Sequence, residues 1–133
     1  HYELRRLCDE LIAWYAVTHA GGTTPAHNAI AVTHNFVGSP HVDRFDTGPQ
    51  LAVALGDFEG GELCVESAEE GGAVVDVVET RGRIAEVDGR RVHWVRRFHG
   101  GERFSLIFYN AAPAAAHNAP PPPGCGNSVV SVE

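Results

Sequence analysis

Between residues 28 and 110, short apolar runs alternate with turn residues, and this pattern constrains the fold more than any other feature of the sequence. The runs are rich in Val, Ile, Phe and Ala, and glycine-containing turns separate them. Short strands at this density are typical of a sandwich, a jelly roll or a barrel. The expected strands cover residues 29–37, 50–55, 62–66, 74–79, 83–87, 92–98 and 103–109. We expect 50–55 and 62–66 to form a hairpin around the Gly-rich turn between them.

A helix is expected before the strands, over Glu3–His19. Leu4, Leu7, Leu11 and Tyr15 recur there at spacings of three and four, which predicts one apolar face. A pair of glycines then ends the helix. We expect the apolar face to cover a sheet.

The 133 residues are enough for one domain. We assign residues 1–110 to a β-rich core with its leading helix and residues 111–133 to an Ala/Pro-rich tail or linker. The chain contains no methionine and opens on a helical pattern, so we expect it to be a fragment of a larger protein. No apolar run is long enough to span a membrane. Three widely spaced cysteines without a CxxC motif fit a reducing, intracellular compartment.

Charge is distributed unevenly around a net value of −7, which argues against a surface that is basic throughout. Seven arginines, here called the arginine cluster, fall between Arg81 and Arg103, with three acidic residues among them. Seven acidic residues fall between Glu59 and Glu79 without a base. The cluster is interpreted either as ordinary solvated strand faces or as a local basic rim on an acidic body.

Two segments carry residues that can bind a metal together. His41 and Asp43 lie two positions apart just after an expected strand, so an extended backbone projects both side chains to the same side. His93 lies in the middle of a later expected strand. Two histidines and one carboxylate are the ligand set that holds catalytic Fe(II) while leaving coordination positions open. The alternative for His93 is a core histidine with a backbone partner, and His99 competes for the ligand role from a turn position.

Arg103 and Ser105 share one face of the last expected strand. An inward arginine in a strand this apolar is costly unless it meets an anion, and the carboxylate of a co-substrate is a natural partner. The alternative is a structural ion pair with an acidic residue. Asp46 follows three positions after Asp43 and is expected either to cap the loop or to contact a co-substrate.

Taken in order, these pieces resemble the core of the TET/JBP branch of the Fe(II) oxygenases. The resemblance covers residues 28 to 110 and rests on Asn35-Phe36, His41-Val42-Asp43, residues 51–55, residues 56–63, Gly89-Arg90, His93 and residues 103–109. It implies a double-stranded β-helix (jelly roll), iron bound by His41, Asp43 and His93, and a co-substrate held by Arg103. We place Ser105 and Asp46 with Arg103 in the co-substrate site.

Within that family, the HVDRFD stretch at residues 41–46 looks most like the green-algal member that modifies 5-methylcytosine in DNA. The resemblance implies an Fe(II)- and O₂-dependent enzyme of the nucleus that uses L-ascorbate as co-substrate and glyceryl donor, where relatives use 2-oxoglutarate. A base entering such a site must leave the DNA stack, and Trp94, Phe45 or Phe98 is a candidate to stack on it. Two alternatives stay open. One is an Fe(II)/2-oxoglutarate hydroxylase of DNA, protein or a small molecule, and the other is a non-catalytic jelly-roll binding module.

Overall fold

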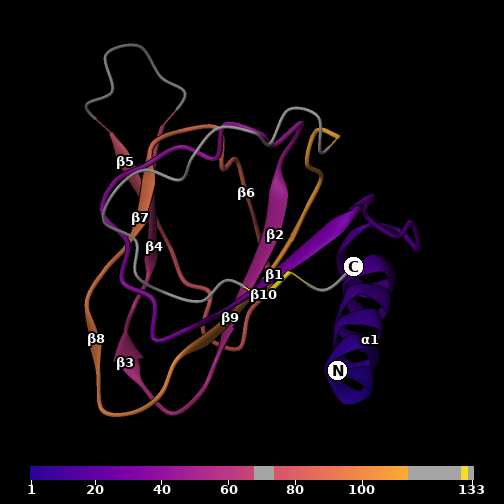
Figure 1. The fold of residues 1–133 in the computed structure, drawn as a ribbon, viewed down its shortest axis with the longest axis horizontal. Coiled ribbons are helices and arrows are strands. Elements are labelled where there is room, and N and C mark those ends of the chain that lie inside the picture. Colours follow the sequence, from indigo (N-terminus) through magenta and orange to yellow (C-terminus); the bar gives the residue numbers. More distant parts are fainter. Residues whose placement is uncertain (68–73, 114–129, 132–133) are drawn as a thin grey trace.

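A small sheet, a large sheet and a helix form three successive layers in the computed structural model, which describes residues 1–67, 74–113 and 130–131 (Figure 1). Strand segments far apart in the sequence lie side by side in both sheets. The elements in chain order are α1 (Tyr2–His19), β1 (Ala29–His34), β2 (Gln50–Leu55), β3 (Glu59–Gly60), β4 (Leu63–Glu66), β5 (Val75–Val78), β6 (Ala85–Val87), β7 (His93–Val95), β8 (Phe98–His99), β9 (Phe104–Tyr109) and β10 (Val130–Ser131).

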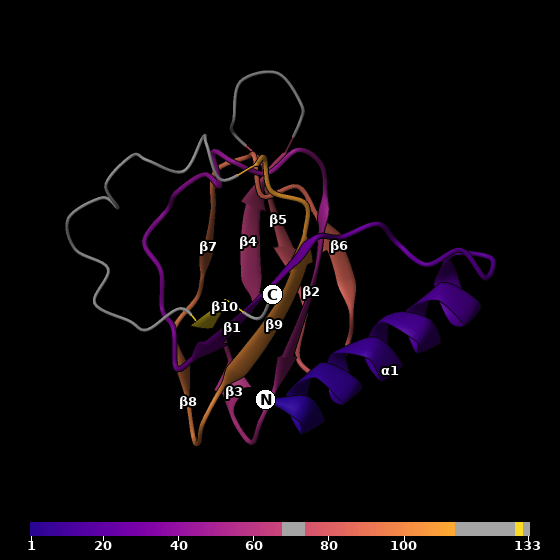
Figure 2. The same cartoon turned by 45° about the vertical axis from the view of Figure 1, so that its right-hand side comes forward.

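Every strand pair in these sheets is antiparallel. The large sheet has the order β10-β1-β9-β2-β6, the small sheet has the order β5-β4-β7, and β3 and β8 form a separate ribbon. The large and small sheets face each other, and α1 packs on the outer face of the large sheet (Figures 1 and 2). This arrangement is the predicted jelly roll with a leading helix.

The expected hairpin between residues 50–55 and 62–66 is wrong. Strand β2 pairs with β6 and β9 in the large sheet, whereas β4 pairs with β5 and β7 in the small sheet. The chain crosses between the sheets in residues 56–61, where Gly56, Gly60 and Gly61 have φ angles of 135°, 79° and 75°. Residues with a β-carbon rarely adopt such angles, so the glycines redirect the chain instead of closing a tight hairpin.

Alternate residues of β9 point to opposite faces of the large sheet. Leu106 and Phe108 pack with Cys8 and Ile12 of α1 in a core between the sheet and the helix. Ile107 points the other way, toward the small sheet. The core on that side comprises Ala52, Leu63, Val65 and Val87. Residues of β9 that share a face with Ile107 therefore point into the space between the two sheets.

Helix α1 begins and ends close to its predicted bounds, but its buried face is centred differently. Leu7, expected on the apolar face, is 40% exposed, whereas Cys8, Ile12 and Ala16 are buried. The partly buried residues beside them are Leu4, Leu11 and Tyr15. The small side chains of Cys8 and Ala16 let the helix approach the sheet closely, and this contact rotates the buried face by about one position.

The expected boundary at residue 110 is not where the ordered contacts stop. Ala111 forms a β-bridge with Asp46, and the amide of Ala112 donates to the carbonyl of Phe45 over 2.9 Å. Most of the Ala/Pro-rich segment lies outside the described residues, so its role as a tail or linker stays a prediction. Within the described part of the chain, no helix combines the length and apolar character needed to cross a bilayer.

Candidate metal centre

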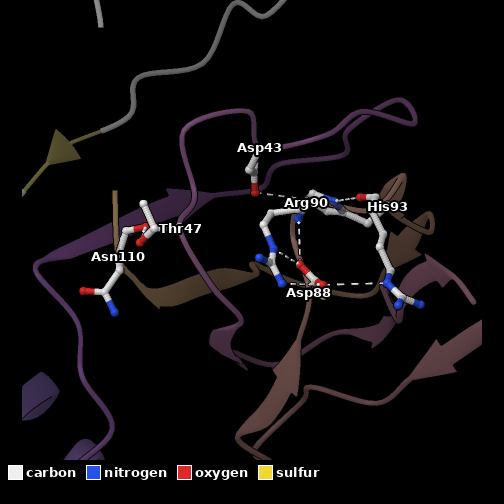
Figure 3. A network of polar contacts seen from close by, with 7 residues as sticks. Asp43, Thr47, Asp88, Arg90, His93 and Asn110 are labelled. Carbon is white, nitrogen blue, oxygen red and sulfur yellow. Dashed lines mark hydrogen bonds and ion pairs between the residues drawn. The ribbon is translucent and has the colours of Figure 1, made fainter. Parts of the chain in front are cut away.

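The three predicted metal ligands come from two segments that the jelly roll brings together. His41 and Asp43 lie on the connection between β1 and β2, and His93 is the first residue of β7. The backbones of His41 and His93 form a β-bridge, with amide-to-carbonyl distances of 3.0 and 2.9 Å in the two directions. The far end of the connection is fixed by Thr47, whose amide donates to the carbonyl of Asn110 over 2.9 Å (Figure 3). Backbone hydrogen bonds thus set the spacing of the three side chains.

The side chains of His41, Asp43 and His93 converge, with one potential ligand atom from each lying within 4.8 Å of the others. The Asp43 carboxylate lies 3.3 Å from His93 Nε2 and 3.7 Å from His41 Nε2. His93 is buried, whereas His41 and Asp43 have side chains 39% and 36% exposed. The cluster is therefore closed on the side of His93 and reachable from solvent on the other.

Both histidines present the same ring nitrogen to the cluster. Nδ1 of His41 lies 2.8 Å from the carbonyl oxygen of Ser39, and Nδ1 of His93 lies 2.8 Å from the carbonyl oxygen of Arg91. A carbonyl only accepts hydrogen bonds, so each Nδ1 carries the proton, and in the neutral ring Nε2 keeps its lone pair. Holding the outer nitrogen of a histidine in this way is usual at metal sites. The donor set therefore fits Fe(II), and iron binding itself stays a prediction.

The charges at this cluster alter one another's protonation. Burial lowers the pKa of His93, but its hydrogen bonds with Asp43 and with the Arg91 carbonyl outweigh burial and raise the pKa above its usual value. Burial, followed by the nearby Asp43 carboxylate, raises the pKa of Asp46 to about 6. Ligands must lose their protons to bind a metal, so metal affinity is expected to rise with pH.

His99 and His34, the other histidines near the expected strand ends, lie outside the cluster. The side chain of His99 is 76% exposed on β8 and lies 3.9 Å from Glu59. His34 stacks on Phe104 with ring centroids 4.5 Å apart and is exposed. Only His93 is therefore placed to complete the set with His41 and Asp43 among the described histidines.

Arg103 is 3% exposed and points between the sheets, as predicted. Its guanidinium donates to Ser105 Oγ and, over 3.2 Å, to the carbonyl of Gly61, while Nε has no hydrogen-bond partner. The Cζ atom of the Arg103 guanidinium lies 5.6 Å from the centre of the Phe58 ring. Within the described residues no carboxylate forms an ion pair with it, and burial lowers its pKa although Glu79 opposes the shift. A buried cation without an acidic partner is the arrangement expected of an anion-binding residue.

Asp46 lies beside the metal cluster and not at the loop surface. Its Oδ2 atom is buried and has no hydrogen-bond partner among the described residues. Gln50, at the start of β2, is also buried, at 5% exposure. Tyr109 is half-buried, and burial, followed by the charges of Asp46 and Asp43, raises the pKa of its phenol.

Sequence reasoning found a turn at Gly89 but missed why a glycine is required there. A β-carbon at position 89 would lie 2.6 Å from Gln50 Nε2, 2.9 Å from Asp43 Oδ2 and 3.0 Å from Asp46 Oδ2. The carbonyl of Gly89 also accepts the amide of Asp43 over 2.8 Å. The absent side chain therefore leaves the space that the Asp43 carboxylate occupies. The sequence marked this position only as part of a turn and, through the Gly89-Arg90 pair, as part of the resemblance.

Replacing Gly89 with Ala is expected to weaken metal binding about tenfold or more while the domain stays folded. The three atoms that must move are the ends of flexible side chains, so the fold can absorb the new methyl group, but the Asp43 carboxylate cannot keep its place. The measurement is anaerobic titration with Mn(II), alongside thermal unfolding of the metal-free protein. Gly48→Ala is the matched control, since a β-carbon there meets no atom within 4 Å. Unchanged Mn(II) affinity in Gly89→Ala would contradict the crowding argument.

No protein-family model matches the chain, and no curated protein matches it. A solved structure does: an oxidoreductase of the 2OG-Fe(II) oxygenase family from Burkholderia pseudomallei superposes with a TM-score of 0.52 over 66% of this chain, at 22% sequence identity. The two chains share a fold. This chain spans 46% of that protein's length, less than half. The predicted jelly roll is confirmed, and the finer placement in the TET/JBP branch stays a prediction.

Proposed function

We propose that this chain is the catalytic part of an Fe(II)- and O₂-dependent oxygenase that modifies the methyl group of 5-methylcytosine in DNA. One observation carries the proposal: His41, Asp43 and His93 converge on a face open to solvent, in a fold shared with a 2OG-Fe(II) oxygenase. The TET/JBP-like order of motifs supports the choice of DNA. We assign the parent protein to the nucleus, where such a substrate is found.

Bound iron would supply the activation of O₂ for attack on an unreactive C–H bond. The role of the chain's own residues is to bind the metal and the co-substrate and to orient them. His41, Asp43 and His93 would hold the metal, and the solvent-exposed side of the cluster would be open to substrate. Arg103 holds an anionic group from the interior, and the apolar core between the sheets excludes water behind it.

We propose L-ascorbate as the co-substrate and glyceryl donor. The unpartnered, buried Oδ2 of Asp46 can accept a hydrogen bond from a hydroxyl group, which ascorbate carries and 2-oxoglutarate lacks. A second carboxylate, as in 2-oxoglutarate, would instead meet the negative charges of Asp43 and Asp46. Asp46 is therefore the residue expected to tune the choice between the two compounds.

The second candidate is an Fe(II)/2-oxoglutarate hydroxylase acting on DNA, protein or a small molecule. The solved structure with the same fold favours it, because that protein is described as a 2OG-Fe(II) oxygenase. The buried Arg103 also suits either co-substrate. A non-catalytic binding module would leave the convergence of three metal-binding side chains without a purpose.

A flipped base needs an aromatic surface close to the metal. Trp94, one of the three candidates, alternates with His93 along β7 and so points to the opposite face of the small sheet. Phe98 packs edge-on against buried Phe58, with ring centroids 5.8 Å apart, as a core residue does. We therefore assign stacking to Phe45, which follows Asp43 by two residues, with half-buried Tyr109, whose pKa is raised in part by the charges of Asp46 and Asp43, as the alternative.

Contact with DNA also needs positive surface, and the arginine cluster offers less of it than its count indicates. Asp88 pairs with two of its arginines, Glu62 lies within ion-pair distance of a third, and a fourth is buried. Exposed Arg81 donates from its guanidinium to the carbonyl of Phe58. Among the described residues, Arg83 and Arg97 of the cluster and Arg44 outside it are exposed and form no ion pair. We assign phosphate contacts to these arginines, together with segments of the parent protein outside this chain, and expect binding to weaken steeply with salt.

The test is turnover by the full-length parent protein. The protein is loaded with Fe(II) without oxygen, mixed with ascorbate or 2-oxoglutarate, and then exposed to O₂ with methylated DNA, unmethylated DNA or a peptide library. Mass spectrometry of the nucleosides is expected to show consumption of 5-methylcytosine and a glyceryl adduct that requires ascorbate. A hydroxymethyl product that requires 2-oxoglutarate, or turnover of a peptide with methylated DNA unchanged, would move the assignment to the second candidate.

A further inference from the structure

The turn Asp88–Arg91, between β6 and β7, contacts two of the three metal-binding residues through its backbone. The carbonyl of Gly89 accepts the amide of Asp43 over 2.8 Å, and the carbonyl of Arg91 accepts Nδ1 of His93 over 2.8 Å. The first contact sets the position of the Asp43 backbone, and the second fixes the ring of His93. The angle between the two ligands therefore depends on the shape of this one turn.

The side chain of Asp88 closes the turn on itself (Figure 3). Its Oδ1 accepts the backbone amide of Arg90 over 3.1 Å, and its two oxygens accept the Arg90 side chain in a fork of 2.8 and 3.0 Å. Arg91 Nε lies 3.7 Å from Oδ2, and the amide of Arg91 donates to the carbonyl of Asp88 over 3.1 Å. Aspartate at the first position of a turn stabilises it in this way because the short side chain reaches the amide two residues on.

We propose that Asp88 is a positioning residue of the metal centre: by closing the turn it holds the carbonyls of Gly89 and Arg91 where they orient Asp43 and His93. The inference rests on the proposed function only in requiring that a divalent metal binds at the cluster. No contact joins the Asp88 carboxylate to the three ligand side chains among the described residues, so its action is through the backbone.

The competing interpretation is an ordinary surface ion pair. The Arg90 side chain is 48% exposed and that of Asp88 is 26% exposed, and exposed pairs contribute little to stability. Under that interpretation, removing the carboxylate leaves metal affinity unchanged. Under ours, metal affinity falls while the stability of the metal-free domain changes little, because the turn loosens without loss of core packing.

The experiment compares Asp88→Ala, Asp88→Asn and Arg90→Gln with Glu62→Ala, which removes the ion-pair partner of Arg96 just before β4, outside the turn. The probe is Mn(II), titrated without oxygen and followed by the electron paramagnetic resonance of the free ion, and thermal unfolding is recorded for each metal-free variant. We expect Asp88→Ala to weaken Mn(II) binding about tenfold or more, as losses of outer contacts at metal sites do. Asp88→Asn keeps an acceptor for the Arg90 amide and should recover part of the affinity, Arg90→Gln should have a smaller effect than Asp88→Ala, and Glu62→Ala should match the wild type.

Two results would overturn the proposal, and they differ from failure of the proposed function. Wild-type affinity in Asp88→Ala, or an equal loss in Glu62→Ala, shows that Asp88 does not position the ligands. If the wild-type protein itself binds no Mn(II), that result contradicts this proposal, the metal centre and the proposed function together. Should Asp88→Ala unfold, the comparison of Asp88→Asn with Glu62→Ala decides the question.

Discussion

Replacing His93 with Ala is expected to abolish metal binding, whereas replacing His99 with Ala is expected to leave it unchanged. His93 Nε2 lies 3.3 Å from the Asp43 carboxylate, and its other nitrogen is held by a backbone carbonyl, so the ring is placed to supply one of three protein ligands. His99 is a strand-end residue whose side chain is 76% exposed. Loss of a direct ligand should cost more than the roughly 10–100-fold typical of an outer contact.

The measurement is metal content after anaerobic loading with Fe(II), with Mn(II) titration as a second readout. His93 is buried, so removing its ring also costs packing, and His93→Gln is included because it keeps most of the volume without the imidazole. Circular dichroism establishes that each variant is folded. Equal iron occupancy in the wild type and the two His93 variants would remove this residue from the ligand set and leave His41 and Asp43 without a second histidine.

The fold was predictable because strand identity is a local property. Apolar runs bounded by glycines located β2 and β9 within one residue of their observed ends. Pairing is often not local: β9 lies between β1 and β2, and β4 pairs with β7 as well as with the next strand along the chain, β5, so several neighbours in the sheets are distant in sequence. The expected hairpin failed for this reason, because the glycines at 56–61 signal a change of direction without saying which strand the chain meets next.

The candidate site was predictable where side-chain chemistry carries the signal. The HxD spacing and the shared face of Arg103 and Ser105 follow from the period of two along extended chain. Contacts made by main-chain atoms left no such signal. Nothing in the residue types of the turn at 88–91 states that its carbonyls hold Asp43 and His93. The contact with Asp43 depends on a close approach between segments about fifty positions apart, and the contact between Arg91 and His93 depends on the backbone conformation of the turn; only the folded chain defines either.

Replacing Arg103 with Lys is expected to raise the apparent KM for the co-substrate about tenfold or more while leaving Mn(II) affinity unchanged. The guanidinium already uses two of its groups on Ser105 and on the carbonyl of Gly61, which aims the rest of the planar fork. An ammonium keeps the charge but loses the fork and both of these anchors at once. A charge-assisted hydrogen bond contributes about 1.5–3 kcal/mol, which corresponds to roughly 10–100-fold in affinity. The effect should be larger with 2-oxoglutarate, which offers a fixed carboxylate, than with ascorbate, so a small change measured with ascorbate would itself favour that co-substrate.

Stability separates this role from a structural one. The Arg103 side chain is 97% buried, lacks an acidic partner among the described residues and has an Nε without a hydrogen-bond partner. Burying this charge imposes a desolvation cost on the domain when no co-substrate is bound. Arg103→Met, which has a similar length and no charge, should therefore leave the melting temperature of the metal-free protein unchanged or raise it while abolishing the response to co-substrate. If Arg103 instead stabilised the fold as an ion-pair partner, Arg103→Met would lower the melting temperature. The substitution would leave a buried carboxylate unpaired and cost about 3–5 kcal/mol of folding free energy. Thermal unfolding with and without ascorbate or 2-oxoglutarate distinguishes the two: binding stabilises the wild type in proportion to ligand concentration, and the Met variant should lose that shift.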